Sequence, residues 1–184
     1  MTANYPPNLT ESLLQRARGV RLAAFDVDGT LTDGRLHYGQ NGAEAKAFHA
    51  HDGLGLKLLA QTGISIALIT ARNSPIVAAR AAELGITLVF QGVHDKAECL
   101  RALCTEQGLL TEQAAFMGDD LPDLGALCLS GLAAGPANAH ALLRPYLHWR
   151  ADRAGGDGAA RELCDLILHA QGQIERIVAR FAPA

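Results

Sequence analysis

The feature that most constrains the fold is a regular alternation of short apolar runs with longer stretches of helical periodicity. The apolar runs predict buried strands at residues 21–27, 64–70, 87–90, 115–118 and 132–134. The stretches around them predict helices at residues 53–61, 74–84, 96–107, 121–129, 137–143 and 158–170. This alternation indicates an α/β fold, a Rossmann-like parallel sheet with helices on both faces, whose functional groups gather beyond the carboxyl ends of the strands.

One segment departs from the alternation. Residues 35–38 and 44–48 flank the turn-rich tetrapeptide 39–42, which predicts a β-hairpin inserted after the first strand. A short surface helix is expected at residues 9–18 and a mobile loop at residues 154–158. We expect residues 1–184 to form a single domain, with a hairpin flap at about 34–50 and a C-terminal helix and tail at about 158–184.

Composition excludes several classes of partner. The formal net charge of -3, with scattered basic residues, argues against binding to nucleic acid or to an anionic membrane surface. No apolar run approaches the length of about 18 residues that spans a bilayer, and residues 1–8 lack the pattern of a signal sequence. A cytoplasmic protein is therefore expected, with its four cysteines reduced.

Polar side chains follow four of the predicted strands at the point where each strand ends. They are Asp26 and Asp28 after the first strand, Thr70 at the second, Lys96 near the third, and Asp119 and Asp120 after the fourth. Because parallel strands end at the same edge of a sheet, these groups are expected to converge on one crevice.

The residue types in this crevice fit the hydrolysis of a phosphate monoester. Close carboxylates repel each other unless a cation lies between them, and oxygen ligands of this kind predict Mg²⁺ as the cofactor. The metal, Lys96 and the Thr70 hydroxyl would neutralise the phosphoryl charge, and Asp26 would be the nucleophile. Asp28 would protonate the departing alcohol and later activate water. Gly29 allows a tight turn, and its amide can face the phosphoryl oxygens.

These residues occur within longer motifs. Asp-Val-Asp-Gly-Thr-Leu-Thr at 26–32, Thr70, Lys96 and Gly-Asp-Asp-Leu-Pro-Asp at 118–123 resemble, in this order, the four motifs of the haloacid dehalogenase superfamily of phosphatases. The resemblance implies that a phosphoryl group is transferred to an aspartate and then to water.

The resemblance also implies roles residue by residue. Asp26 would be the nucleophile and a magnesium ligand, Asp28 the general acid and base with its backbone carbonyl on the metal, and Asp119 the third protein ligand. Thr70 would bind the phosphoryl group and Lys96 would neutralise it. Asp120 and Asp123 would hold the metal's waters or Lys96 from outside.

A narrower resemblance covers residues 20–172. Segments 33–34, 39–42, 46–48, 52–55, 84–86, 91–92 and 154–162 are similar to the family of 3-deoxy-D-manno-octulosonate 8-phosphate phosphatases. This implies Mg²⁺-dependent release of the free sugar acid in lipopolysaccharide precursor synthesis. It also implies a homotetramer without cap domains, in which a neighbouring subunit covers the crevice.

The implied substrate carries a carboxylate as well as a phosphate, so a second cationic group should orient it. Arg72 and Arg80 are the candidates, and the expected substrate-binding residues are Gly29, Thr30, Ala71, Arg72 and Arg80. Three alternatives stay open at this stage. They are a phosphatase of nine-carbon sialic-acid-type sugar phosphates, a signalling receiver module, and a phosphatase-like module retained only for oligomerisation.

Overall fold

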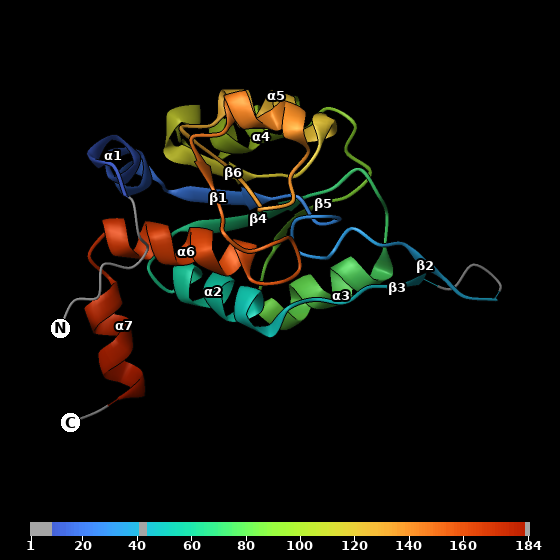
Figure 1. Ribbon diagram of the computed structural model, residues 1–184, viewed down its shortest axis with the longest axis horizontal. Helices are drawn as coiled ribbons and strands as arrows, with labels where there is room; N and C mark the ends of the chain where they lie inside the picture. The colour runs from blue at the N-terminus through green and yellow to red at the C-terminus, as the bar shows by residue number, and fades with distance from the viewer. Residues whose placement is uncertain (1–8, 41–43, 183–184) are drawn as a thin grey trace.

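A six-stranded parallel sheet forms the centre of the computed structural model, which describes residues 9–40 and 44–182 (Figure 1). The strand order is β5-β4-β1-β6-β7-β8. The strands are β1 (Leu22–Phe25), β4 (Ser65–Ile69), β5 (Leu88–Phe90), β6 (Ala114–Met117), β7 (Leu132–Gly135) and β8 (Trp149–Arg150). The central strand β1 pairs with β4 on one side and β6 on the other, and all four of its residues are buried.

Helices cover both faces of this sheet because its side chains alternate between two hydrophobic cores. Ala23 and Phe25 of β1 face one core, while Leu22 and Ala24 face the other. The first core is covered by α1 (Glu11–Gly19), α2 (Ala50–Ala60), α3 (Pro75–Leu84) and α6 (Ala159–Ala170). The second is covered by α4 (Lys96–Glu106), α5 (Leu124–Leu129) and the 3₁₀ helix η4 (Ala141–Tyr146). The predicted α/β class with helices on both faces is confirmed.

The remaining elements lie around this sandwich. Two short 3₁₀ helices, η2 (Thr111–Gln113) and η3 (Leu121–Asp123), flank β6, and α7 (Ile174–Phe181) extends from the end of α6 (Figure 1). Within the described residues there is no separate cap domain, as expected. No helix in the part of the chain that the structure describes is long and apolar enough to cross a membrane.

The inserted hairpin is present and projects from the body of the molecule (Figure 1). Its strands β2 (His37–Tyr38) and β3 (Glu44–Ala45) pair antiparallel, with His37 opposite Ala45 and Tyr38 opposite Glu44. Asn41 and Gly42, which belong to the predicted turn, lie outside the described residues. The prediction of a hairpin after the first strand is therefore confirmed for the strands.

Two sequence-based expectations were wrong near the C-terminal edge of the sheet. The segment predicted as a helix at 137–143 forms η4 three to four residues later, because Pro145 lacks the backbone donor of a continuous α-helix. Strand β8 was missed because it has only two residues, neither of them fully buried.

The loop at residues 154–158, expected to be mobile, packs closely against the loop that follows β1. Gly156 donates its amide to the carbonyl oxygen of Thr30 at 3.1 Å, and Gly155 donates its amide to Oδ1 of Asn138 at 2.9 Å. A Cβ atom at Gly155 would overlap the carbonyl oxygen of Gly29. Glycine is thus required here for close approach of two backbones.

We therefore expect Gly155→Ala to destabilise the protein by about 1–3 kcal/mol, because the added methyl group forces the two loops apart. Urea unfolding measures this change. Gly19→Ala is the matched control, because Gly19 lies in α1 with open space around it, and its replacement should be neutral or stabilising by up to about 1 kcal/mol. Equal stability of Gly155→Ala and the unmodified protein would contradict the close packing.

Candidate active site

The carboxyl ends of β1, β4 and β6 bring the expected polar residues to one edge of the sheet. Asp26 follows β1 directly, and its amide donates to the carbonyl oxygen of Met117 on β6 at 2.9 Å. Thr70 follows β4, and Asp119 follows β6 by two residues. Lys96 comes from α4, whose start is set by Asp95, because Oδ1 of Asp95 accepts the amide of Glu98.

Lys96 lies buried between two carboxylates. Its Nζ donates to Oδ1 of Asp26 and to Oδ1 of Asp123, each at 2.5 Å. All three side chains are at most 7% exposed. Burial acts to lower the pKa of Lys96, but the two carboxylates outweigh it and hold that pKa above its usual value. A permanent positive charge therefore lies beside Asp26.

The carboxylates are too crowded for Lys96 alone to balance. Ligand oxygens of Asp26, Asp119 and Asp123 all lie within 4.8 Å of one another. Burial, followed by the charge of Asp123, raises the pKa of Asp26 to about 7 and that of Asp119 to about 6. This arrangement suits a hard divalent cation, which would remove the repulsion and keep both groups ionised.

Asp123 differs from Asp26 and Asp119 in that both of its carboxylate oxygens accept hydrogen bonds from the protein. Its Oδ1 accepts from Lys96, and its Oδ2 accepts the amides of Asp119 and Asp120 at 2.9 and 3.2 Å. Asp26 and Asp119 are thus the two carboxylates of this cluster better placed to bind a metal, and the expected ligand set of Asp26, Asp28 and Asp119 stays a prediction. Asp123 instead holds Lys96, as one of its two expected roles required.

Asp120 behaves differently from Asp123. It is exposed, and its Oδ1 accepts the amide of Leu121 at the start of η3. Capping of a short helix is the ordinary role of an aspartate at such a position. These contacts do not support the expected role of Asp120 in holding the metal's waters, and that role stays a prediction.

The loop after β1 packs closely against the carboxylate of Asp119. Gly29 has a φ of 104°, and a Cβ atom there would overlap the carboxylate of Asp119. The next residue, Thr30, is fully buried, and its Oγ1 has no hydrogen-bond partner among the described residues. Thr32, which sequence reasoning did not single out, fixes the loop because its Oγ1 accepts the amides of Gly29 and Gly34.

Thr70, Ala71 and Arg72 line the same edge from the end of β4. Thr70 is 1% exposed, and its Oγ1 accepts the amide of Arg72 at 3.2 Å, while Ala71 is exposed. The side chain of Arg72 is 40% exposed, and its Nε lies 4.0 Å from Oδ2 of Asp28. Arg72 is thus beside the site and partly open to solvent, as a substrate-binding cation would need to be.

Sequence reasoning missed two residues at the base of the hairpin, Lys46, which contacts Asp28, and Glu44, which contacts Lys46. Lys46 Nζ forms an ion pair with Oδ1 of Asp28 and lies 3.1 Å from Oε1 of Glu44. Glu44 also accepts from Oγ of Ser74 at 2.7 Å and from Arg72 at 3.4 Å. The hydrogen bond from Ser74 and the charge of Lys46 outweigh the opposing effect of burial and lower the pKa of Glu44. Glu44 and Lys46 are two residues apart, a spacing that places both side chains on the same face of an extended segment. This spacing could have indicated from the sequence that the two act together.

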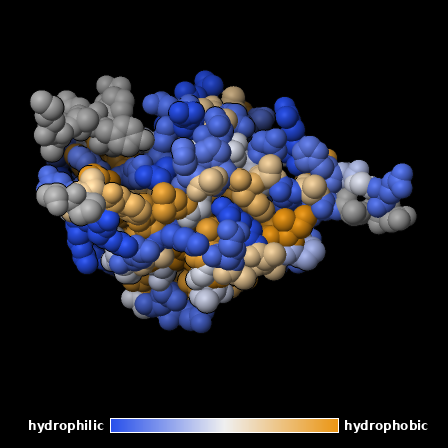
Figure 2. All heavy atoms as spheres, turned by 90° about the horizontal axis from the view of Figure 1, so that it is seen from below, coloured by the Kyte–Doolittle hydropathy of each residue, from blue (hydrophilic) through white to orange (hydrophobic). Residues whose placement is uncertain are grey.

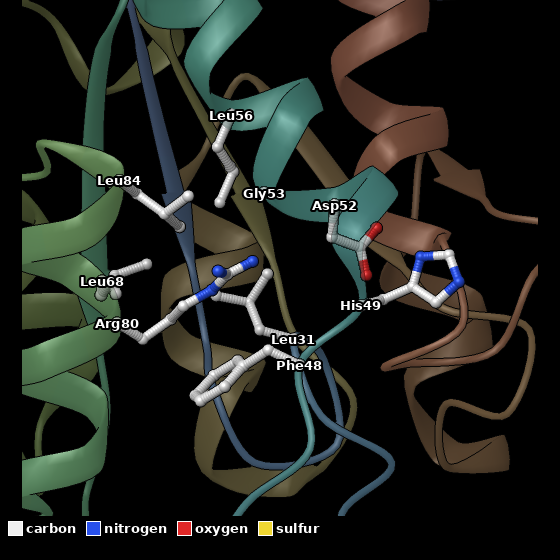
Figure 3. A pocket seen from close by; sticks show the side chains of 9 residues that line it. All are labelled: Leu31, Phe48, His49, Asp52, Gly53, Leu56, Leu68, Arg80 and Leu84. Carbon is white, nitrogen blue, oxygen red and sulfur yellow. The ribbon is translucent and has the colours of Figure 1, made fainter.

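Arg80, the weaker candidate for binding substrate, lies elsewhere in this chain. It points from α3 into a cavity of about 10 Å³, no larger than one water molecule, between Phe48 and Gly53 (Figure 3). Its guanidinium lies 5.6 Å from the ring centroid of Phe48 and 2.9 Å from Glu83. These contacts do not bring Arg80 to Asp26, so its role in binding substrate is unsupported within one chain.

Known proteins share this sequence and fold. The chain is 41% identical to the 3-deoxy-D-manno-octulosonate 8-phosphate phosphatase of Yersinia pestis over 91% of this chain and 89% of that protein. A solved phosphatase of that name from Moraxella catarrhalis, in complex with magnesium, phosphate and the sugar acid, superposes with a TM-score of 0.92 at 41% identity, covering 95% of this chain and all of that one. A Xanthomonas campestris structure matches with a TM-score of 0.95 at 51% identity, covering 99% of this chain and all of that one. No family model matches the chain.

The raised pKa values predict how pH changes metal binding. Without metal, the folded protein binds more protons at Asp26 and Asp119 than the unfolded chain does between their ordinary pKa of 3.8 and about 7. The stability of the metal-free protein therefore falls as pH rises through this range, and Mg²⁺ binding, which displaces those protons, strengthens.

We expect the increase in melting temperature caused by Mg²⁺, relative to EDTA, to be larger at about pH 8 than at about pH 5.5. Differential scanning fluorimetry measures it. Asp119→Asn should shrink the increase at both pH values, whereas Asp152→Asn, at an exposed position outside the cluster, should leave it unchanged. An increase that is the same at both pH values would refute the assignment of these carboxylates as ligands.

Proposed function

This chain belongs to the family of 3-deoxy-D-manno-octulosonate 8-phosphate phosphatases within the haloacid dehalogenase superfamily, and we propose that it hydrolyses that substrate to the free sugar acid and phosphate with Mg²⁺ as cofactor. The observation that carries the proposal is the buried contact of Lys96 with Asp26, beside the carboxylate of Asp119. The free sugar acid would serve lipopolysaccharide precursor synthesis.

The first chemical step is the transfer of the phosphoryl group to Asp26. A carboxylate oxygen of Asp26 attacks phosphorus, and the bond from phosphorus to the sugar oxygen breaks. Asp28 gives its proton to the departing oxygen, which leaves as the alcohol. Lys96 stabilises the charge on Asp26 and the phosphoryl oxygens, while the buried hydroxyls of Thr30 and Thr70 are available to donate to those oxygens. Mg²⁺, when bound by Asp26, Asp119 and the carbonyl of Asp28, neutralises further phosphoryl charge.

The second step restores the enzyme. Asp28, now a carboxylate, takes a proton from water while that water attacks phosphorus, and the bond from phosphorus to Asp26 breaks. Inorganic phosphate leaves, and Asp28 is again protonated for the next cycle. One residue thus serves as acid and then as base, which its place two residues after Asp26 permits.

Substrate orientation depends on groups around this centre. The amide of Gly29 is engaged by Thr32 Oγ1, so its expected contact with the phosphoryl oxygens is not supported, whereas Ala71 is exposed and Arg72 would be the cation for the sugar-acid carboxylate. Arg80 is engaged by Phe48 and Glu83, so we assign it no part in binding a substrate beside Asp26 of its own chain.

Assembly into a homotetramer forms part of the proposal. A two-stranded hairpin is marginally stable alone, yet β2 and β3 project from the molecule and expose Leu36 and Tyr38. Leu54 of α2 is exposed as well, and Figure 2 shows hydrophobic residues on the face turned toward the viewer, close to where the hairpin projects. A neighbouring subunit that covers these side chains would also enclose the crevice.

The free cysteines of the chain support a cytoplasmic location, where thiols stay reduced.

Asp26→Asn should abolish phosphate release, with a loss of at least about 10⁴-fold, because an amide is a poor nucleophile. Its melting temperature should stay close to that of the unmodified protein, since the two side chains have nearly the same volume. Phosphate release assayed with Mg²⁺ measures the first quantity. Undiminished turnover would refute Asp26 as the nucleophile.

A panel of phosphorylated sugars tests the substrate. With Mg²⁺, kcat/KM for the eight-carbon sugar-acid phosphate should exceed that for glucose 6-phosphate by about 100-fold or more, because only the former offers a carboxylate to Arg72. Arg72→Met should reduce this preference mainly through KM. A preference for the nine-carbon sugar-acid phosphate would instead support the alternative substrate.

Light scattering during size-exclusion chromatography tests the assembly. We expect the mass of four chains, and Tyr38→Asp should lower both the mass and the activity on the sugar-acid phosphate, because a charge at an apolar interface opposes association. A fully active monomer would contradict the proposal that a neighbouring subunit encloses the crevice.

A further inference from the structure

Lys46 is the one lysine besides Lys96 whose ammonium group is withdrawn from solvent, although it lies outside the motifs that bind phosphate. Its side chain is 1% exposed, while Lys57, the remaining lysine, lies exposed on α2. A buried ammonium group is costly unless it is paired, and Lys46 is paired with both Asp28 and Glu44. Such a position reflects a specific partner rather than a solvated surface charge.

The two oxygens of Asp28 have different surroundings. Oδ1 is held by Lys46, whereas Oδ2 is buried and has no hydrogen-bond partner among the described residues. Nε of Arg72 lies 4.0 Å from Oδ2, which is too long for a direct hydrogen bond. An aspartate side chain rotates about two bonds, so an anchor on one oxygen also fixes where the other one points.

Lys46 is itself held from behind. Oε1 of Glu44 lies 3.1 Å from Nζ of Lys46, and Oε2 of Glu44 accepts the hydroxyl of Ser74 at 2.7 Å. Ser74 precedes α3, so this chain of contacts joins the base of the hairpin to the body of the protein. Lys46 is thus held by Asp28 and by Glu44.

We propose that Lys46 is a positioning residue for catalysis, which pins Oδ1 of Asp28 so that Oδ2 faces the departing oxygen and later the attacking water. The inference rests on the proposed phosphatase function, in which Asp28 transfers these protons. It assigns the base of the hairpin a part in the chemistry, besides any part in assembly.

The test compares two esters in single turnovers of Lys46→Met, which keeps the length of the side chain and removes its charge. Glucose 6-phosphate releases an alcohol that must be protonated, whereas p-nitrophenyl phosphate releases a phenolate that leaves without a proton. We expect cleavage of glucose 6-phosphate to slow by about 10–100-fold, because part of the contribution of general acid catalysis is lost. Cleavage of p-nitrophenyl phosphate should slow by less than about threefold, because its leaving group needs no proton. Asp28→Asn should show the same selectivity to a larger extent.

Lys57→Met is the matched control and should leave both rates unchanged. Equal slowing of both esters by Lys46→Met, or no slowing of either, would overturn the positioning role. If Lys46→Met does not fold, as judged by circular dichroism, Glu44→Gln decides, because it loosens Lys46 without removing it and should slow only the glucose ester. Failure of the unmodified enzyme on the eight-carbon sugar-acid phosphate would reject the proposed substrate, yet the comparison of these two esters would still decide the role of Lys46.

Discussion

The buried contact of Lys96 with Asp26 and Asp123 is the interaction on which the rest of the site depends. Two carboxylates cannot lie this deep without a cation, and breaking a buried pair of this kind typically costs about 3–5 kcal/mol. Lys96 is the first residue of α4, so it can supply this cation only if α4 begins at the carboxyl edge of the sheet, where Asp95 caps the helix. Asp123 in turn holds the loop after β6 through the amides of Asp119 and Asp120. Charge balance thus sets the positions of three separate segments.

Close backbone packing provides the second condition. Glycine at position 29 leaves space for the carboxylate of Asp119, and glycine at position 155 lets a loop more than a hundred residues away lie against that same turn. The crevice is therefore shaped from two sides, although it has no cap domain of its own within the described residues. Rigid walls of this kind suit phosphoryl transfer, in which catalysis consists mainly of positioning and charge stabilisation.

The sequence was sufficient for the framework and for the motif residues, but not for contacts made across the fold. Alternating apolar and helical runs predicted the sheet, and Asp26, Lys96 and Asp119 were expected together because parallel strands end at one edge. Lys46 was not singled out, because its pairing with Asp28 depends on how a hairpin folds back over 18 residues. Similarly, the turn of Arg80 towards Phe48 depends on the packing of α3 against α2, which no local pattern encodes.

Reductive trapping of the phosphorylated intermediate tests the role of Asp26 as nucleophile most directly. Borohydride converts an aspartyl phosphate to homoserine, so rapid quenching of a turnover reaction with borohydride, followed by peptide mass spectrometry, locates the phosphorylated residue. If Asp26 is the nucleophile, homoserine should appear at position 26 only, and only when both substrate and Mg²⁺ are present. Homoserine at another aspartate, or its absence throughout active turnover, would contradict a mechanism that proceeds through Asp26.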